Sequence, residues 1–448
     1  MFGVAPTVRV HPGDTIKVYY FNYLPAGTPV VMNMTNLHFH GLRVSPQLGS
    51  DDVLDMLSAP GQFLNYSVTI PANHPPGLYW YHTHPHGETN RQAGDGAMSG
   101  AIVVEGMQEH LPILASMTER ILVIRAPLGK GKIDPTIVRR RILRHLNAVI
   151  APAGGQPPAC ANGLDSAHTV TVNGAVTPTI PIAPNEAQFF RVVNATGQRT
   201  LDLSIPTRTL YIVALDGVPL DMYPGSPPML AVQHLVLPAA GRAEFVVFGP
   251  SQTTPLMTSC YFTGNGGDPD PEATLAWLRP TGAMQRETQA VLTPHLRVNP
   301  LRRNLMSVAL PPPAQRRTTV FSENAAGTQF FIDGKQFAPG EPPRFIIKSG
   351  TVEEWTVLNK TNEIHDFHIH QVHFIVEAIN GVPVPPPYFW YDSFILPYQT
   401  KNSDGTTTPG SLKLLLDFRD PVIKGKFVYH CHLLDHEDKG MMATIAVE

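Results

Sequence analysis

The segment His430-Cys-His-Leu-Leu-Asp-His-Glu-Asp-Lys-Gly-Met-Met442, near the end of the chain, is the most informative stretch of this sequence. Residues 428–433 have the character of a strand, in which successive side chains point to opposite faces. His430 and His432 are therefore expected on one face and Cys431 on the other. One segment would then serve two metal centres.

The Cys431 face has further candidate ligands downstream. His436 and Met441 follow in the same segment, and thiolate, imidazole and thioether are the soft ligands that hold an electron-transfer copper together with a second histidine. The motif His365-Asp-Phe-His368-Ile-His370 offers that histidine. His368 and His370 share a strand face while His365 stands apart, so this motif is also expected to divide between two sites.

Two more histidine pairs complete the pattern, His38-Phe-His40-Gly41 and His82-Thr-His84. In each pair both imidazoles project to the same side of a strand. A single pair of this kind is often a coincidence of surface or core. Four such motifs, one of them with a cysteine between its histidines and a methionine downstream, predict a copper protein.

Together these residues resemble the multicopper oxidases, a family that includes laccases, cuprous oxidases and ferroxidases, and the resemblance covers nearly the whole chain. It implies four coppers. The type 1 (blue) copper would be held by His365, Cys431 and His436 with axial Met441, and the type 2 copper by His38 and His368. One type 3 copper would be held by His40, His82 and His432, and the other by His84, His370 and His430.

Composition limits the other possibilities. The chain has 448 residues, about three times a usual domain of ~150. Lys and Arg (33) nearly balance Asp and Glu (36), so no nucleic acid or membrane partner is expected. Abundant Pro (45) and Gly (36), with no long helical periodicity, favour many short strands joined by turns.

Cysteine usage and the amino end bear on the compartment. Cys160 and Cys260 could form a disulfide in an oxidising compartment, but two cysteines leave this open. No signal peptide is recognisable, because a strand-like segment follows Met1 almost at once. A periplasmic or secreted location is our expectation.

A strand, a turn and an alternating strand that ends in asparagine occur three times, and the three copies end at Asn22, Asn194 and Asn359. A domain-sized unit therefore recurs. Strand-like segments precede the second and third copies at 168–173 and 329–333, but only eight residues precede the first, so the first domain looks trimmed at its amino end.

A second repeat relates the two ends of the chain. Gly77-Leu-Tyr-Trp-Tyr-His-Thr-His84 matches Gly425-Lys-Phe-Val-Tyr-His-Cys-His432, with Thr83 in the place of Cys431. The middle unit has no such motif, so we expect it to be a spacer. The predicted fold is all-β, with three Greek-key β-sandwiches that the resemblance makes cupredoxin-like. Their predicted bounds are 1–108, 118–281 and 315–448, with a linker at 282–314.

The predicted function is that of a laccase-like enzyme, a benzenediol:oxygen oxidoreductase. It would oxidise phenols or similar substrates at the edge of His436 and reduce O2 to water at the cluster of three coppers. Glu437 and Asp51, the latter with Asp52 as an equally readable neighbour, are candidate proton donors. Asp366 is expected to orient an imidazole.

Two alternatives remain at this point. A metal oxidase acting on Cu(I), Fe(II) or Mn(II) would need an acidic or thioether cluster beside His436, for which Asp435, Asp438 and Asp392 are the candidates. A non-catalytic cupredoxin scaffold would not need the complete set of ligands.

Overall fold

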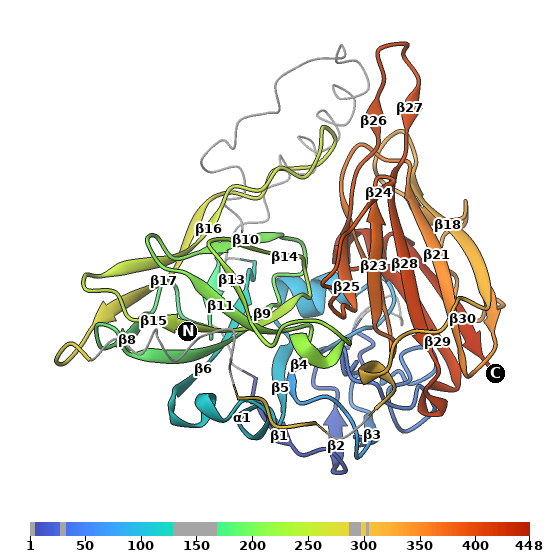
Figure 1. The fold of residues 1–448 in the computed structure, drawn as a ribbon. Coiled ribbons are helices and arrows are strands. Elements are labelled where there is room, and N and C mark those ends of the chain that lie inside the picture. Colours follow the sequence, from blue (N-terminus) through green and yellow to red (C-terminus); the bar gives the residue numbers. More distant parts are fainter. Residues whose placement is uncertain (1–4, 27–32, 129–167, 286–296, 302–303) are drawn as a thin grey trace.

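The computed structural model describes residues 5–26, 33–128, 168–285, 297–301 and 304–448, and these form an almost entirely β architecture (Figure 1). Their strands build three successive sandwiches, which confirms the predicted fold class. In Figure 1 the first sandwich is blue, the middle one mainly green and yellow, and the third orange to red.

The first sandwich combines a three-stranded and a two-stranded sheet. The larger sheet has the order β1 (Val8–Val10), β5 (Ser99–Val104), β4 (Gly77–His82), and the smaller pairs β2 (Thr15–Phe21) with β3 (Phe63–Thr69). A π-helix, η1 (Asn90–Asp95), separates β4 from β5. Helices α1 (Met107–His110) and η2 (Pro112–Ser116) lead to the next sandwich.

The middle sandwich has a five-stranded and a seven-stranded sheet. The first has the order β14 (Leu235–Leu237), β10 (Leu201–Ser204), β16 (Thr254–Ser259), β17 (Ala273–Pro280), β8 (Thr179–Ile182). The second has the order β12 (Val218–Pro219), β11 (Leu210–Leu215), β15 (Arg242–Phe248), β9 (Ala187–Asn194), β6 (Thr118–Arg125), β7 (Thr171–Val172), with β13 (Leu230–Val232) beside β11. A 3₁₀ turn, η3 (Leu220–Met222), follows β12.

The third sandwich has six-stranded and five-stranded sheets and a small hairpin. The six-stranded order is β19 (Phe330–Ile332), β18 (Gln315–Glu323), β21 (Thr351–Asn359), β28 (Gly410–Phe418), β23 (Phe374–Ile379), β24 (Val382–Pro383). The five-stranded order is β20 (Phe345–Ile347), β30 (Met442–Val447), β29 (Gly425–Cys431), β22 (His365–Ile369), β25 (Ser393–Leu396). The hairpin pairs β26 (Thr400–Lys401) with β27 (Thr407–Thr408), and the short helices are η5 (Leu305–Ser307), η6 (Pro421–Ile423) and α3 (Leu434–Asp438).

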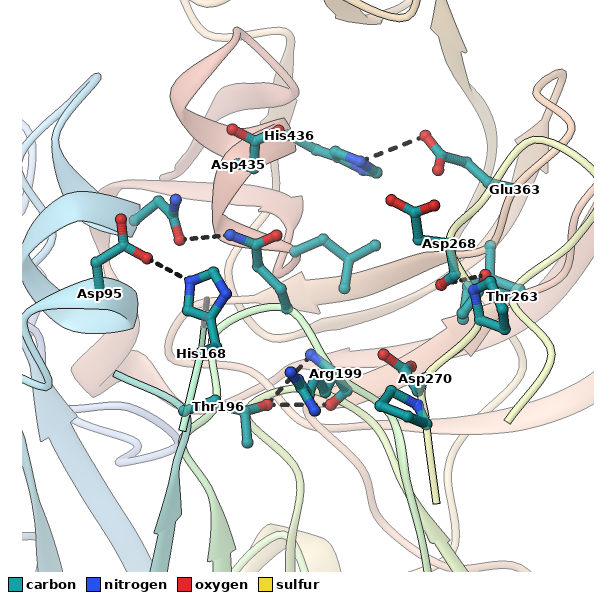
Figure 2. A pocket seen from close by; sticks show the side chains of 17 residues that line it. Asp95, His168, Thr196, Arg199, Thr263, Asp268, Asp270, Glu363, Asp435 and His436 are labelled. Atoms are coloured by element: carbon teal, nitrogen blue, oxygen red, sulfur yellow. Dashed lines mark hydrogen bonds and ion pairs between the residues drawn. The ribbon is translucent and has the colours of Figure 1, made fainter. Parts of the chain in front are cut away.

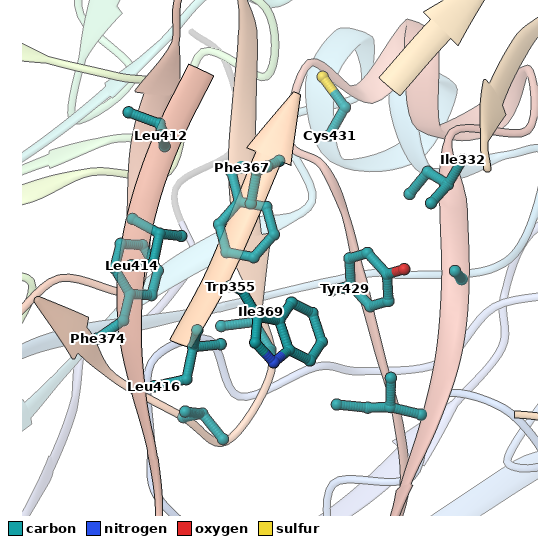
Figure 3. Packing of buried hydrophobic residues seen from close by; sticks show 14 of the residues in the cluster. Ile332, Trp355, Phe367, Ile369, Phe374, Leu412, Leu414, Leu416, Tyr429 and Cys431 are labelled. Carbon is teal, nitrogen blue, oxygen red and sulfur yellow. The ribbon is translucent and has the colours of Figure 1, made fainter. Parts of the chain in front are cut away.

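Alternation along β22 and β29 connects the third core to the site. Phe367 on β22 pairs with Cys431 on β29, and both point into the core around Trp355 and Tyr429 (Figure 3). His368 and His430, the next pair in the register, are directed to the other face of the sheet. Burial of the apolar face fixes this register, because a slip by one residue would exchange the two faces.

The threefold repeat corresponds to a strand pair in each sandwich: β1 and β2, β8 and β9, β20 and β21. The asparagine at each end is fully buried, and its side-chain amide donates to loop carbonyls, such as Ser58 O from Asn22 and Arg199 O from Asn194. These bonds fix the loop that follows the second strand, which explains why the repeat ends in this residue type.

The strand-like segments expected at 168–173 and 329–333 contain the short strands β7 and β19, so strands do precede the second and third copies. The longer strands beside the repeat are β6, which pairs in parallel with β9, and β18, which pairs in parallel with β21. Within the described residues, β2 pairs with β3 alone. The first sandwich therefore has no described strand where β6 and β18 lie in the others.

Candidate copper centres

Cys431, His365 and His436 meet at one end of the third sandwich. Sγ of Cys431 lies 3.5 Å from Nδ1 of His365 and 3.7 Å from Nδ1 of His436, and the two nitrogens are 3.1 Å apart. Nε2 of His365 is 3.0 Å from Oγ1 of Thr361, which can accept its proton and leave Nδ1 as a lone-pair donor. Three donor atoms thus converge on one point.

The surroundings of this group are apolar. Met441 is fully buried in the same core cluster as Cys431, and Phe330 stacks on His436 with ring centroids 4.1 Å apart. Burial raises the pKa of Cys431 well above its ordinary value and lowers the pKa of His365 to about 3. A soft cation would displace the thiol proton and meet a neutral imidazole, which is the state that binds metal.

Eight further histidines form one buried cluster between the first and third sandwiches. Each is at most 1% exposed; they are His38, His40, His82, His84, His368, His370, His430 and His432. Nε2 of His430 lies 3.4 Å from Nε2 of His84 and 3.2 Å from Nε2 of His370. His38 stacks on His370 and His40 on His368, with ring centroids 3.8 Å and 4.0 Å apart. Both domains therefore contribute to the cluster.

Hydrogen bonds on the far side of the rings orient four of these histidines in the same way. In each, Nδ1 faces an oxygen, and Nε2 points into the cluster. The oxygens are Oδ1 of Asp51 for His38, the carbonyl of Thr83 for His82, the carbonyl of Asp392 for His368 and the carbonyl of Cys431 for His430, at 3.0, 2.9, 2.8 and 3.0 Å.

Other ring nitrogens are buried and have no hydrogen-bond partner within the described residues. They include Nε2 of His38, His82 and His368, Nδ1 of His40, and both nitrogens of His432. Burial and neighbouring imidazoles also lower the pKa of six members well below the ordinary value: His40, His82, His84, His368, His370 and His432. A fully buried cluster of neutral, unsatisfied imidazoles is the donor set that copper fits.

The two predicted proton donors both contact this cluster. Asp51 accepts from the backbone amide of Phe39 (2.9 Å) and from Nε2 of Gln371 (2.5 Å), besides facing His38. Asp52 instead accepts from the amides of Leu54 and Asp55, so it stabilises a turn. The geometry thus favours Asp51 over its neighbour.

Glu437 lies in α3, next to His436. One carboxylate oxygen is 3.1 Å from Nδ1 of His430 and the other 3.6 Å from Nε2 of His84. Burial raises the pKa of Glu437, but these two histidines outweigh burial and lower it to about 2. Glu437 is therefore an anion at neutral pH that lies within hydrogen-bond reach of the cluster.

Three acidic residues make contacts other than the predicted ones. Asp392 contacts Nε2 of His40 at 3.2 Å and so lies at the cluster, not beside His436. Asp438 accepts from the amides of Thr89 and Asn90. Asp366 accepts from the amide of Ala239, and no imidazole bond to it is present among the described residues. Sequence spacing could not reveal these loop contacts.

A cavity of about 250 Å³ opens beside His436 and is lined by the middle and third sandwiches as well as the first (Figure 2). Its lining includes five carboxylates, Asp95, Asp268, Asp270, Glu363 and Asp435. Oε1 of Glu363 lies 3.3 Å from Nε2 of His436, which is the edge of the ring that faces the cavity. An electron donor bound here would be in contact with a candidate ligand.

Sequence reasoning missed Glu363, Gln371 and Arg242, which contact predicted site residues. It also assigned too small a role to the middle domain, which supplies Asp268 and Asp270 to the cavity and Arg242 to the cluster. The expectation that it is only a spacer was therefore wrong. Glu363 could have been found from the sequence, because it lies two residues before the predicted ligand His365. Arg242 is not close in sequence to any predicted ligand, so no sequence pattern indicated it.

Three remaining side chains can be placed briefly. His86 packs against Phe337 with the ring planes tilted, and His373 is buried with Nε2 3.2 Å from the carbonyl of Asp216, so neither joins the converging donor atoms. Cys160 lies outside the described residues, so its pairing with Cys260 stays open.

Fold and site together define a class of protein in which linked cupredoxin-type sandwiches carry two adjoining sets of copper-type ligands. Sequence profiles described as multicopper oxidase match residues 3–109, 151–283 and 309–448. The chain belongs to the multicopper oxidase family. This enzyme family implies copper as the cofactor and O2 with a reducing substrate as the reactants.

Individual relatives are distant. The laccase of Bacillus subtilis (strain 168) is 22% identical over 487 residues, which covers 99% of this chain and 88% of the relative. The cell division protein FtsP of Sodalis glossinidius is 24% identical over 399 residues, covering 87% and 74%. A solved multicopper oxidase from Campylobacter jejuni, described as a metallo-oxidase, is similar with a TM-score of 0.72 at 22% identity, covering 99% of this chain and 85% of that one. The structural likeness supports the cupredoxin-like fold.

Among the described residues, no helix has the length and apolar character needed to cross a membrane.

Proposed function

We propose that this protein is a laccase-like multicopper oxidase that couples one-electron oxidation of phenolic or similar substrates to four-electron reduction of O2 to water. The observation that carries the proposal is the junction at Cys431. Its sulfur belongs to the group with His365 and His436, while the adjacent His430 belongs to the eight-histidine cluster. When bound, four coppers would take electrons singly from the substrate and supply four to O2.

The ligands are proposed from the family motifs, and two of the four sets coincide with groups of converging donor atoms. His365, Cys431 and His436, with Met441 as a fourth ligand, would hold type 1 copper, and His84, His370 and His430 one type 3 copper; each set of three lies within reach of one ion. His40 and His82, with His432, would hold the other type 3 copper, and His38 and His368 the type 2 copper. Within each of these two sets the ring centroids lie 5.0–6.0 Å apart.

Cys431 gives this chain a short covalent connection between its two sites. Its backbone is continuous with His430 and His432, and alternation in β29 directs their side chains away from the sulfur. An electron that enters at His436 needs to cross only the sulfur and a few backbone bonds. Thr83, at the equivalent place just after β4, offers no such path.

Glu437 and Asp51 are proposed to handle protons. Each is buried and contacts a histidine of the cluster, Glu437 on the His84 side and Asp51 on the His38 side. Reducing O2 to two waters consumes four protons, which must cross a protein shell that excludes bulk water. A carboxylate at hydrogen-bond distance can pass them on.

The cavity beside His436 is proposed as the substrate site. Its volume of about 250 Å³ suits a single-ring phenol, and Glu363 is placed to accept a phenolic proton as the electron leaves. The carboxylate would also favour donors that carry an amine.

A metal oxidase is the second candidate, and the acidic lining of the same cavity favours it. The five carboxylates that line the cavity are hard oxygen ligands of the kind that bind Fe(II) or Mn(II), and they are less suited to Cu(I), which prefers thioethers and thiolates. The complete ligand set argues against a non-catalytic scaffold. A periplasmic or secreted location remains our proposal for either enzyme.

Substrate preference is tested by comparing turnover of a phenol, Fe(II), Mn(II) and Cu(I), for the parent and for Glu363→Gln. We expect the phenol to be the best donor and kcat/KM for it to fall by roughly 10²-fold in the variant, the scale of a lost proton acceptor. Turnover of a metal ion without phenol turnover would instead identify a metal oxidase. If the copper-loaded protein oxidises none of these donors, the non-catalytic scaffold becomes the favoured hypothesis.

A further inference from the structure

A buried ion pair connects the middle sandwich to the histidine cluster. Arg242, the first residue of β15, and Asp392, just before β25, are 0% and 1% exposed. Nη1 of Arg242 donates to Oδ1 of Asp392 at 2.7 Å, and Nη2 donates to Oδ2, so the pair is bidentate. Asp216 fixes both partners by accepting from their backbone amides at 2.9 Å and 3.1 Å.

Asp392 contacts two histidines of the cluster. Oδ1 is 3.2 Å from Nε2 of His40, and the main-chain carbonyl is 2.8 Å from Nδ1 of His368. One residue therefore orients a proposed type 3 ligand and a proposed type 2 ligand.

The orientation of His40 is the reverse of its neighbours' orientation. His38, His82, His368 and His430 bind oxygens through Nδ1, whereas His40 meets its carboxylate through Nε2. Nδ1 of His40 is buried without a hydrogen-bond partner within the described residues. A carboxylate at Nε2 selects the tautomer with the proton there, which leaves Nδ1 as the lone-pair donor.

The backbone next to His40 is packed against the same ion pair. Gly41 has φ +81°, and a Cβ at this position would overlap the Arg242 guanidinium and the Asp392 carboxylate. This contact gives a physical reason for the glycine in His38-Phe-His40-Gly41. It also shows that the pair fixes the main chain as well as the ring.

We propose that Arg242 and Asp392 form a positioning pair, through which the middle domain holds His40 as the Nε2-protonated tautomer with Nδ1 toward the metal. The inference rests on the proposed four-copper function. Arg242 fixes the direction of the Asp392 carboxylate, and Asp392 transmits this to the ring of His40. Removing either partner would leave the other buried charge uncompensated.

The test compares Asp392→Asn and Arg242→Lys with Glu244→Gln as the matched control. Glu244 lies two residues from Arg242 on β15, is equally buried and forms an ion pair with Arg191 at 2.9 Å, yet it contacts no histidine among the described residues. The readouts are copper per chain after dialysis against a copper chelator, the blue absorption band, and the fraction of copper visible by electron paramagnetic resonance.

We expect Asp392→Asn to weaken copper retention in the cluster by roughly 10- to 100-fold, the usual effect of losing a partner of a ligand. The blue absorption band should persist. A larger fraction of the remaining copper should become visible by electron paramagnetic resonance, because the type 3 pair is disturbed. Arg242→Lys keeps the positive charge but loses the two parallel hydrogen bonds of the guanidinium to Asp392. It should therefore show the same change to a smaller degree. Glu244→Gln should lower thermal stability only.

The inference is overturned if Asp392→Asn retains cluster copper with the parent's resonance spectrum, or if Glu244→Gln loses copper to the same extent. Should Asp392→Asn not fold, Arg242→Lys decides alone, and a parental spectrum then overturns the inference. A parent that binds fewer than four coppers would contradict the proposed function itself. Four coppers in parent and variants would contradict only the positioning role.

Discussion

At the scale of single residues, the chemistry depends on which nitrogen or oxygen of each side chain faces inward. Thr361 turns Nδ1 of His365 toward Cys431, and Asp51 turns Nε2 of His38 toward the cluster. These partners fix tautomers before any metal binds. Substitution of a partner should therefore alter a site whose ligands are all retained.

Glu437 allows a direct test of proton handling. We expect Glu437→Gln to lower turnover at saturating substrate by roughly 10²-fold, because an amide cannot relay a proton, while copper content stays unchanged. Stopped-flow reduction of the blue band under nitrogen should proceed at the parental rate, since electrons enter at His436. Glu363→Gln is the control and should show the opposite division. Parental turnover in Glu437→Gln would remove this carboxylate from the mechanism.

His74 should make the protein sensitive to acid. Burial lowers its pKa to about 3, whereas an unfolded histidine titrates near 6.5. Below pH 6.5 the unfolded chain binds a proton that the folded chain does not, so the free energy of unfolding falls by ~1.4 kcal/mol per pH unit down to about pH 3. The contribution of His74 to stability is thus fully present above pH 6.5 and is lost as the pH falls toward 3.

The measurement is the thermal midpoint of the parent and His74→Gln at pH 7 and pH 4.5. Glutamine can still accept from the amide of Arg43, which donates to His74 at 3.0 Å, but it does not titrate. The variant's midpoint should fall less on acidification than the parent's. His11→Gln, at a side chain 75% exposed, should behave like the parent. Equal falls in all three proteins would contradict the linkage.

At the scale of elements, the strand that ends in asparagine is the recurring unit, and in the third domain it also serves the site. Asn359 Oδ1 accepts from Oγ1 of Thr361, which in turn faces Nε2 of His365. Asn194 makes the corresponding bond to Thr196 in the middle domain, where there is no copper motif. The same local structure thus has a structural role in one domain and orients a ligand in the other.

Alanine at Asn194 and at Asn359 should separate these roles. Both variants should lose stability, by about 1–3 kcal/mol, because buried loop carbonyls lose their donor. Only Asn359→Ala should shift the energy or intensity of the blue absorption band, since only that loop holds His365. A parental band in Asn359→Ala, or an equal shift in Asn194→Ala, would contradict the link.

Sequence periodicity predicted the elements well because strand alternation and the repeat are local properties. The division of His430 and Cys431 between two faces follows from a period of two residues, and the structure places them on opposite faces of β29. The parallel pairing of β6 with β9 was not predicted, because it joins segments separated by a long connection. No local pattern marks such a pair.

At the scale of the whole molecule, the site is built where domains meet. First and third sandwiches share the histidines, while the middle one supplies Arg242 to the cluster and carboxylates to the cavity. Motif spacing could predict the histidines because each pair is two residues apart. It could not predict Arg242 with Asp392, which are 150 residues apart and meet only through tertiary packing.

Copper should stabilise the assembled domains as well as the site. Ions that bind only the folded protein add RT ln(1 + [L]/Kd) to stability, about 4 kcal/mol at a thousandfold excess over Kd. Removing copper with a chelator should therefore lower the thermal midpoint, and adding it back should restore the value. An apoprotein with the same midpoint as the loaded form would argue against bridging of the first and third domains by metal.

The most direct test of the central claim is the copper content of the purified, copper-loaded protein. The twelve proposed ligands predict four coppers per chain, with a blue absorption band from the ion bound by Cys431. A colourless protein, or one that holds fewer than four coppers per chain, would contradict the account.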